Sequence, residues 1–320
     1  GAHGSESFRI KNSHCEVINT SSFKKLRVVD PIGCGDTFFA IFGINYFKTK
    51  DFKFSAKRAN IEMIYQPIDM AVRSDMHEFL TDIQPELIIN AAAYTNVDKC
   101  EVEREQCWNT NVRAVENIAE SDLNPKTIIV HISTDYVFDG ENPPYREKDK
   151  PNPRGNYARS KMASENIVRA SQFEYVIVRT QVLYGTGNRL RPNFVTWIIE
   201  QLRNNKKIKV VTDQIGNPTY NHDVSEGIYR LLQTENYGIF HISGSESINR
   251  FDFAVKIASV FNLDEKLIES TTTSNLEQKA PRPANSTFVL DKLYNNIGWL
   301  PHDAESGLKL LKKEMNAVNE

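Results

Sequence analysis

Short apolar runs alternate along this chain with longer segments in which apolar residues recur at helical spacing. Apolar strands separated by helices are typical of a parallel sheet that is covered on both faces. The predicted strands are Leu26–Val29, Leu87–Ala92, Thr127–Ser133, Tyr175–Arg179, Ile208–Val211 and Ile239–Ile242. The predicted helices are Thr37–Phe47, Met70–Asp82, Val102–Ser121, Tyr157–Ala170, Pro192–Asn204, Asp223–Gln233, Phe251–Phe261 and Glu305–Met315. We therefore expect an α/β fold with a parallel sheet and helices on both faces.

The length, net charge and apolar runs of the chain limit the kinds of binding partner that we expect. With 320 residues, the chain is long enough for two domains and a sizeable core. The net charge of -2 gives no electrostatic case for binding nucleic acid or an anionic membrane. The longest apolar runs, such as Leu87–Ala93, are too short to span a bilayer, and we find no signal peptide. We expect a small-molecule ligand and neither nucleic acid nor membrane.

The four cysteines form no CxxC pair, and they are too few for a disulfide framework. A reducing, cytoplasmic location is therefore expected. The seven histidines are scattered, without an HExxH motif or a Cys/His cluster, so we predict no metal site.

A glycine-containing loop, Gly33-Cys34-Gly35-Asp36, lies between the first predicted strand and helix. Small residues before a helix allow backbone N–H groups to converge on an anion. The loop does not fit GxGxxG, because Phe38 occupies a glycine position and Asp36 would direct a carboxylate at the pyrophosphate. Its D-x-x-G-x-G-D pattern instead resembles the C-terminal signature of PfkB-family sugar kinases.

That resemblance covers residues 1–60, much less than a whole kinase. It implies that Asp36 is the base acting on a sugar hydroxyl and that Gly33 and Gly35 stabilise the transferred phosphoryl group. We interpret the segment as a non-functional kinase-like remnant.

Two later stretches place small or hydroxylated residues after predicted strands. In the first, Ile89–Asp98, the alanines Ala91, Ala92 and Ala93 precede Tyr94; they suit a flat cofactor or an ordinary tight turn. In the second, His131–Gly140, the hydroxyl groups of Ser133 and Thr134 suit a carbonyl oxygen or a loop cap, and Asp135 and Tyr136 follow them.

A YxxxK pair follows, formed by Tyr157 and Lys161. At this spacing both side chains lie on one helical face. A nearby ammonium favours the phenolate and lowers the phenol pKa from about 10, which suits acid catalysis near neutral pH. Tyr157 lies 23 positions after Thr134, so we favour a catalytic pair over a surface pair.

Two C-terminal motifs complete the set: Asp213–Thr219, which contains Asn217, and Pro281-Arg282-Pro283. Arginine is a natural partner of a diphosphate. Arg282 suits that role and that of an ordinary surface residue equally well.

Together these motifs, in this order, resemble the dTDP-4-dehydrorhamnose reductase family of short-chain dehydrogenases. The resemblance implies a Rossmann-like domain at residues 61–185 and a smaller mixed sugar-nucleotide lobe at residues 186–320. It implies NADPH or NADH as cofactor and a dTDP-linked 4-keto-6-deoxysugar as substrate. Thr134, Tyr157 and Lys161 would be catalytic. Cofactor would contact Ala91, Ala92, Ala93, Tyr94, Ser133, Tyr157 and Lys161, and substrate would contact Thr134, Asp135, Tyr136, Gln181, Asn217 and Arg282.

Two departures leave other functions open. Gln181 stands where these reductases usually carry Trp, and no GxxGxxG loop lies between Asn60 and Asn90. Without that loop we expect weak NAD(P)H binding, unless the Leu26–Val29 strand and its glycine loop fill the vacant position. The alternatives are a non-catalytic regulatory protein, such as the reductase-like subunit of methionine adenosyltransferase, and a fragment of a bifunctional kinase–reductase. The sequence leaves oligomeric state open, a homodimer included.

Overall fold

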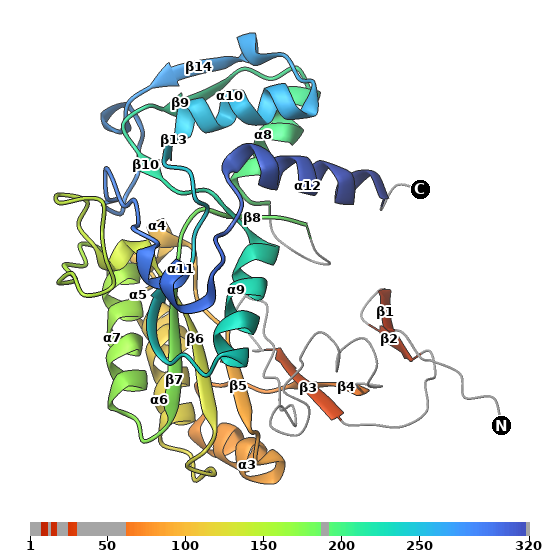
Figure 1. Cartoon of the computed structure of the whole chain (residues 1–320), viewed down its shortest axis with the longest axis vertical. Helices are drawn as coiled ribbons and strands as arrows, with labels where there is room; N and C mark the ends of the chain where they lie inside the picture. The colour runs from red at the N-terminus through yellow and green to blue at the C-terminus, as the bar shows by residue number, and fades with distance from the viewer. Residues whose placement is uncertain (1–7, 12–13, 18–24, 31–61, 187–191, 318–320) are drawn as a thin grey trace.

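The computed structural model describes residues 8–11, 14–17, 25–30, 62–186 and 192–317. Figure 1 shows a larger lobe built around a four-stranded sheet, which we call the sheet lobe, and a small lobe beside it. The sheet has the order β12-β7-β6-β5, and all its neighbouring strands are parallel. Its strands are β5 (Leu87–Asn90), β6 (Ile128–Thr134), β7 (Glu174–Thr180) and β12 (Gly238–His241). The predicted parallel sheet is confirmed.

Alternating side chains of the strands form a separate core on each face of the sheet. Ile129 and Ile177 belong to a core shared with α3 (Arg73–Ile83), α6 (Ala114–Ala119) and α7 (Asn156–Ala170). Val130 and Val176 belong to a second core, shared with α9 (Asn221–Gln233) and α11 (Asp291–Ile297). Because successive strand residues point to opposite faces, apolar runs of this kind need helices on both sides.

One predicted helix, Val102–Ser121, is divided into shorter elements. The structure has α4 (Val97–Cys100), α5 (Arg104–Trp108), the π turn η1 (Asn109–Arg113) and then α6. The π turn includes the buried Asn111, whose side chain accepts a hydrogen bond from the Tyr94 backbone N–H at 2.6 Å. The break therefore coincides with a polar contact to the loop after β5.

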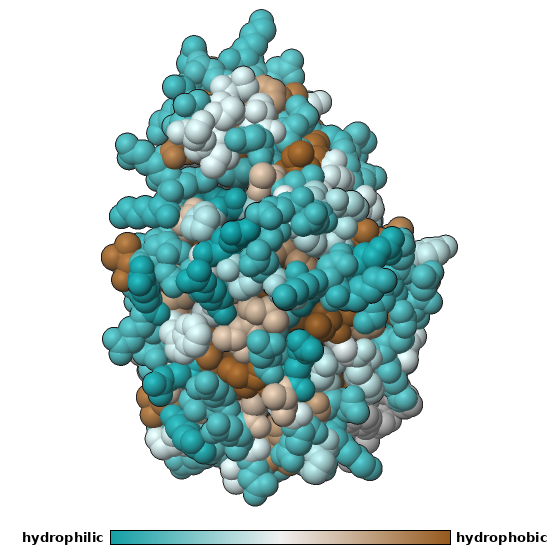
Figure 2. Space-filling model, turned by 90° about the vertical axis from the view of Figure 1, so that its left-hand side faces the viewer, coloured by the Kyte–Doolittle hydropathy of each residue, from teal (hydrophilic) through white to brown (hydrophobic). Residues whose placement is uncertain are grey.

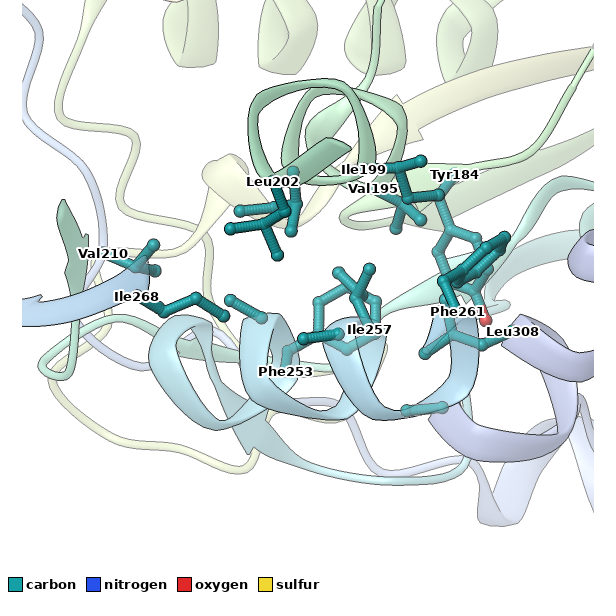
Figure 3. Packing of buried hydrophobic residues seen from close by; sticks show 14 of the residues in the cluster. Tyr184, Val195, Ile199, Leu202, Val210, Phe253, Ile257, Phe261, Ile268 and Leu308 are labelled. Atoms are coloured by element: carbon teal, nitrogen blue, oxygen red, sulfur yellow. The ribbon is translucent and has the colours of Figure 1, made fainter. Parts of the chain in front are cut away.

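The small lobe has its own apolar core, drawn in Figure 3. Its elements are α8 (Phe194–Arg203), β9 (Ile208–Val211), α10 (Arg250–Phe261), β14 (Ile268–Thr271), α12 (Ala304–Ala317) and the short turns η3 (Glu265–Leu267) and η4 (Thr273–Asn275). Strand β14 pairs in parallel with β9. Phe253 and Ile257 of α10 point toward Val195 and Ile199 of α8, so α10 packs against α8 through its apolar face.

Short strand pairs connect the two lobes. Strand β8 (Leu183–Tyr184) pairs with β11 (Thr219–Tyr220), and β10 (Ile215–Gly216) pairs with β13 (Ile248–Asn249). The chain passes between the lobes more than once: α9, β12 and α11 lie within residues 186–320 but pack on the sheet lobe. The small lobe is therefore not one continuous stretch of chain.

Four strands precede the sheet lobe. Strand β1 (Phe8–Lys11) pairs antiparallel with β2 (His14–Val17), and β3 (Lys25–Asp30) pairs in parallel with β4 (Glu62–Pro67). The predicted strand Leu26–Val29 is confirmed by β3, whereas the predicted helix Thr37–Phe47 lies outside the described residues. The β3–β4 pair forms a separate two-stranded sheet and is not hydrogen-bonded to β5.

Figure 2 shows one face of the molecule, mostly hydrophilic with small scattered apolar groups. Within the described ranges, no helix is long and apolar enough to cross a bilayer.

Candidate active site

Thr134 and Tyr157 meet at the carboxyl end of the parallel sheet. Thr134 is the last residue of β6 and caps the turn η2 (Asp135–Val137) by accepting a hydrogen bond from the Tyr136 backbone N–H at 3.2 Å. Tyr157 lies in the first turn of α7, and its side chain is hydrogen-bonded to that of Thr134. The Tyr136 ring meets the Tyr157 ring edge-on, with centroids 6.0 Å apart. The predicted hydroxyl pair is therefore assembled in one place.

Lys161, one turn after Tyr157, is buried beneath this pair and only 1% exposed. Its Nζ donates to the Ile132 carbonyl at 2.7 Å and lies 3.2 Å from His131 Nε2. Burial lowers the Lys161 pKa to about 8. Burial, together with the Lys161 charge, also lowers the pKa of His131 well below its usual value, so this imidazole is neutral at pH 7. Lys161 is therefore held as a cation against β6 by neutral partners.

The pKa of Tyr157 is raised, chiefly by burial, although the Thr134 hydrogen bond opposes the rise. The sequence predicted the opposite direction, from an ammonium close to the phenol. The difference arises because burial dominates the environment of the phenol, while Lys161 donates to the Ile132 carbonyl at the end of β6. The phenol is consequently protonated at neutral pH, which is the state that a proton donor needs.

A buried ion pair between Arg179 and Glu165 lies next to the catalytic residues. Arg179 of β7 donates from Nε and Nη2 to the two carboxylate oxygens of Glu165, at 2.9 and 2.7 Å. The Ser133 hydroxyl donates to Glu165 Oε1 at 2.5 Å. Glu165 lies one turn beyond Lys161 on the same face of α7. Ser133, predicted to contact cofactor, is thus engaged with the protein interior.

The residues after Thr134 are linked to the loop at 284–288. Ser286 donates to Asp135 Oδ2 at 2.5 Å, and burial raises the Asp135 pKa to about 6. Gln181 Nε2 donates to the Ser286 carbonyl at 3.1 Å, and its Oε1 accepts from the Asn217 backbone N–H at 2.9 Å. Gln181 and Asn217 are buried and bonded to protein groups, so the structure brings these two predicted substrate residues together behind the site.

Arg282 is paired with Asp98, the last residue of the Ile89–Asp98 motif. Its Nη1 and Nη2 donate to the two Asp98 oxygens at 2.9 and 2.8 Å, and Nη1 also reaches the Ala280 carbonyl at 2.9 Å. The Arg282 hydrogen bond lowers the Asp98 pKa. Two motifs far apart in sequence therefore form one contact, which joins α4 to the C-terminal loop.

Three alanines follow β5 at the carboxyl end of the sheet. Ala92 and Ala93 are buried, whereas Ala91 is exposed. Tyr94 is buried with Cys100 and Cys107, both free thiols, and Tyr157 packs against this group. A nicotinamide cofactor fits this corner, because the small Ala91 side chain would admit a flat ring and Lys161, with three N–H donors, has the Ile132 carbonyl as its described acceptor.

Several supporting residues were not predicted, notably His131, Glu165, Arg179 and Ser286. Glu165 could have been found from its spacing to Tyr157 and Lys161, which places all three on one helical face. The kinase-like residues Gly33, Gly35 and Asp36 lie outside the described residues. Within those residues no cluster of three His, Cys, Asp or Glu could hold a metal ion.

A parallel sheet carrying a Thr, Tyr and Lys at its carboxyl edge defines a short-chain dehydrogenase/reductase. Residues 45–317 match a family model described as the RmlD substrate binding domain. A dTDP-4-dehydrorhamnose reductase from Aggregatibacter actinomycetemcomitans is 33% identical over 261 residues, covering 78% of this chain and 87% of that protein. The chain therefore belongs to the dTDP-4-dehydrorhamnose reductase family.

Two other relatives are informative. A crystal structure of dTDP-4-dehydrorhamnose reductase from Bacillus anthracis in complex with NADP superposes with a TM-score of 0.77 at 32% identity, covering 91% of this chain and all of that one. The methionine adenosyltransferase 2 subunit beta of Bos taurus is 31% identical over 235 residues, covering 72% of this chain and 70% of that protein. The family model begins at residue 45, inside the segment interpreted as kinase-like.

Proposed function

We propose that this protein reduces the 4-keto group of dTDP-4-dehydro-6-deoxy-L-mannose, using NADPH or NADH, to give dTDP-L-rhamnose. The observation that carries the proposal is the assembly of Thr134, Tyr157 and Lys161 at one sheet edge. Membership of the reductase family and the NADP complex of the Bacillus anthracis relative support it.

A bound nicotinamide supplies the hydride that reaches the keto carbon. Tyr157, protonated because burial raises its pKa, donates its phenolic proton to the developing alkoxide. The Thr134 hydroxyl, held beside Tyr157, hydrogen-bonds the same oxygen and fixes its direction. Lys161 holds a positive charge beneath the phenol, and an N–H that does not bond the Ile132 carbonyl can donate to a ribose hydroxyl.

On the substrate side, Asp135 and Tyr136 follow Thr134 and face the sugar, while Gln181 and Asn217 shape the wall behind them. A homodimer and a cytoplasmic location remain predictions of this proposal, as does the interpretation of residues 1–60 as a kinase-like remnant.

A regulatory function is the second candidate, because a methionine adenosyltransferase subunit is among the relatives. The complete Thr134, Tyr157 and Lys161 set favours the reductase, because binding alone does not require a half-buried proton donor one helical turn from a buried lysine.

The deciding experiment is turnover by the purified chain. It is incubated with dTDP-4-dehydro-6-deoxy-L-mannose and either NADPH or NADH, up to millimolar concentration because no described residue supplies a glycine loop for the pyrophosphate. We expect cofactor oxidation and formation of dTDP-L-rhamnose. No turnover, together with activation of a methionine adenosyltransferase catalytic subunit, would replace the reductase with the regulatory function.

A further inference from the structure

Strand β10, within the Asp213–Thr219 motif, lies between two other segments. On one side it pairs with β13, and the Arg250 backbone N–H donates to the Gln214 carbonyl at 3.0 Å. On the other side, Ile215 donates its backbone N–H to the Ala284 carbonyl at 2.8 Å. Arg250 follows β13 directly and Arg282 precedes Ala284 closely, so β10 places the two arginines on opposite sides of one strand.

The two guanidinium groups differ in their partners. The Arg282 guanidinium is hydrogen-bonded to the Asp98 carboxylate, the Ala280 carbonyl and the Tyr136 side chain. A bidentate pair with a carboxylate neutralises most of its charge toward any further anion. Arg282 therefore links α4 to the C-terminal loop through its pair with Asp98.

Among the residues that the structure describes, no carboxylate is hydrogen-bonded to the Arg250 guanidinium. Its guanidinium carbon lies 5.1 Å from the centroid of the Phe194 ring, at the start of α8. Stacking on a ring occupies the face of the guanidinium and leaves its N–H donors, which lie in the plane, available. Burial lowers the Arg250 pKa, the nearby Tyr136 and Asp135 side chains oppose that shift, and the Arg282 charge adds to it. Arg250 is thus a desolvated cation that faces the Asp135 carboxyl group without being hydrogen-bonded to it in the way that Arg282 is bonded to Asp98.

We propose that Arg250 is the residue that binds the diphosphate of the nucleotide-sugar substrate, and that Arg282 positions the loop and does not provide the main phosphate contact. The inference rests on the proposed function for the identity of the substrate. A dTDP-sugar carries two phosphate charges between its base and its sugar, and a guanidinium can donate two parallel N–H bonds to phosphate oxygens. With the sugar at Thr134 and Tyr157, the diphosphate lies toward the small lobe. Arg250 begins α10 of that lobe, and its charge interacts electrostatically with Asp135 and Tyr136.

The test compares the binding of dTDP with that of thymidine, so that the contribution of the phosphates is measured separately from the base. Calorimetric titrations use the full chain as wild type and as Arg250→Gln, Arg250→Lys and Arg282→Gln. Arg230→Gln is the matched control, because the Arg230 guanidinium also lies over an aromatic ring, Trp299 at 5.5 Å, but on the sheet lobe. Thermal unfolding of each variant reports whether it folds.

We expect wild type to bind dTDP more tightly than thymidine. In Arg250→Gln this preference should fall about 10- to 100-fold with thymidine affinity unchanged, since each charge-assisted hydrogen bond is worth roughly one to two decades. Arg250→Lys should keep part of the preference, and Arg282→Gln and Arg230→Gln most of it.

An unchanged preference in Arg250→Gln, or an equal loss in Arg282→Gln, overturns the assignment. If Arg250→Gln does not fold, an unchanged preference in Arg250→Lys overturns it. A wild-type chain without preference for dTDP has no diphosphate subsite, which also overturns it. If wild type prefers dTDP but shows no turnover, the reductase proposal fails while the titrations still decide the role of Arg250.

Discussion

The sheet lobe and the junction between the lobes each hold an arginine in a bidentate pair with a carboxylate. In the sheet lobe, Arg179 and Glu165 are almost fully buried, and Glu165 also accepts the Ser133 hydroxyl. At the junction, the Arg282 and Asp98 side chains are 14% and 37% exposed. The first pair fixes strands and helix around the catalytic residues, and the second ties a loop across the substrate side.

The different burial of the two ion pairs indicates that the sheet lobe and the junction have different functions. Around the sheet, the buried polar groups of Lys161, Glu165 and Arg179 are bonded to one another or to strand backbone, so the catalytic geometry is set before substrate arrives. At the junction, the contacts join separate segments, and Arg250 keeps donors available. Substitutions in the sheet lobe should therefore affect turnover and stability, and substitutions at the junction should affect binding.

The largest effect is expected at turnover. Tyr157→Phe removes the phenolic proton but keeps the ring against Tyr136, and general acid catalysis contributes roughly 10²–10⁴-fold. We expect kcat to fall by about that factor with little change in KM for the sugar nucleotide. Steady-state kinetics measure both constants, and Tyr294→Phe, an exposed tyrosine on α11, is the control. A variant with near wild-type kcat would remove Tyr157 from the role of acid.

Next in size is the effect on stability. Glu165→Ala leaves the Arg179 charge buried without its carboxylate, which costs about 3–5 kcal/mol for a pair of this kind. Asp98→Ala breaks the more exposed pair, and solvent screening limits its cost to about 1 kcal/mol. Urea unfolding of both variants measures the free energies of unfolding. Equal losses would show that the two pairs do not differ in the way proposed.

Several strands and catalytic residues could be predicted from the sequence, whereas the contacts at the junction between the lobes could not. Continuous apolar runs identify β6 and β7, because burial on both faces of the sheet leaves a clear pattern. Strands of two residues, such as β10 and β13, carry no such pattern, yet they place Arg250. The motifs locate Thr134 and Tyr157, but only the folded chain shows that Arg282 turns to Asp98.

A smaller effect on stability follows from the Asp135 carboxyl group. Its folded pKa of about 6 lies above its unfolded value of about 3.9, because burial disfavours the charge. The folded state thus binds more protons between about pH 4 and pH 6, and the free energy of unfolding falls as pH rises through that window.

Asp135→Asn removes this titration and keeps a polar group beside Ser286. We expect the variant to be more stable than wild type at pH 7, by about 1–3 kcal/mol, because it buries no ionised carboxylate, with no gain at pH 4. Unfolding experiments at the two pH values measure the difference. A variant that loses stability equally at both would show that the Ser286 contact matters more than burial of the charge.

The smallest effect is expected from a substitution at Asp36. Asp36 belongs to the Gly33–Asp36 loop, which we interpret as part of a kinase-like remnant and not as the dinucleotide loop. Strand β3, which precedes that loop, pairs with β4 in a sheet separate from β5, so it does not extend the sheet that carries Thr134. Because we assign this loop no part in reduction, Asp36→Asn should leave both NADPH affinity and kcat/KM within about twofold of wild type. Fluorescence titration with NADPH and steady-state kinetics measure the two quantities, with Asp252→Asn on the small lobe as the control. A large change in NADPH affinity confined to Asp36→Asn would mean that this loop binds the cofactor pyrophosphate. The β3–β4 pair would then be a working part of the cofactor site, and the contrast between the sheet lobe and the junction would have to include a third region.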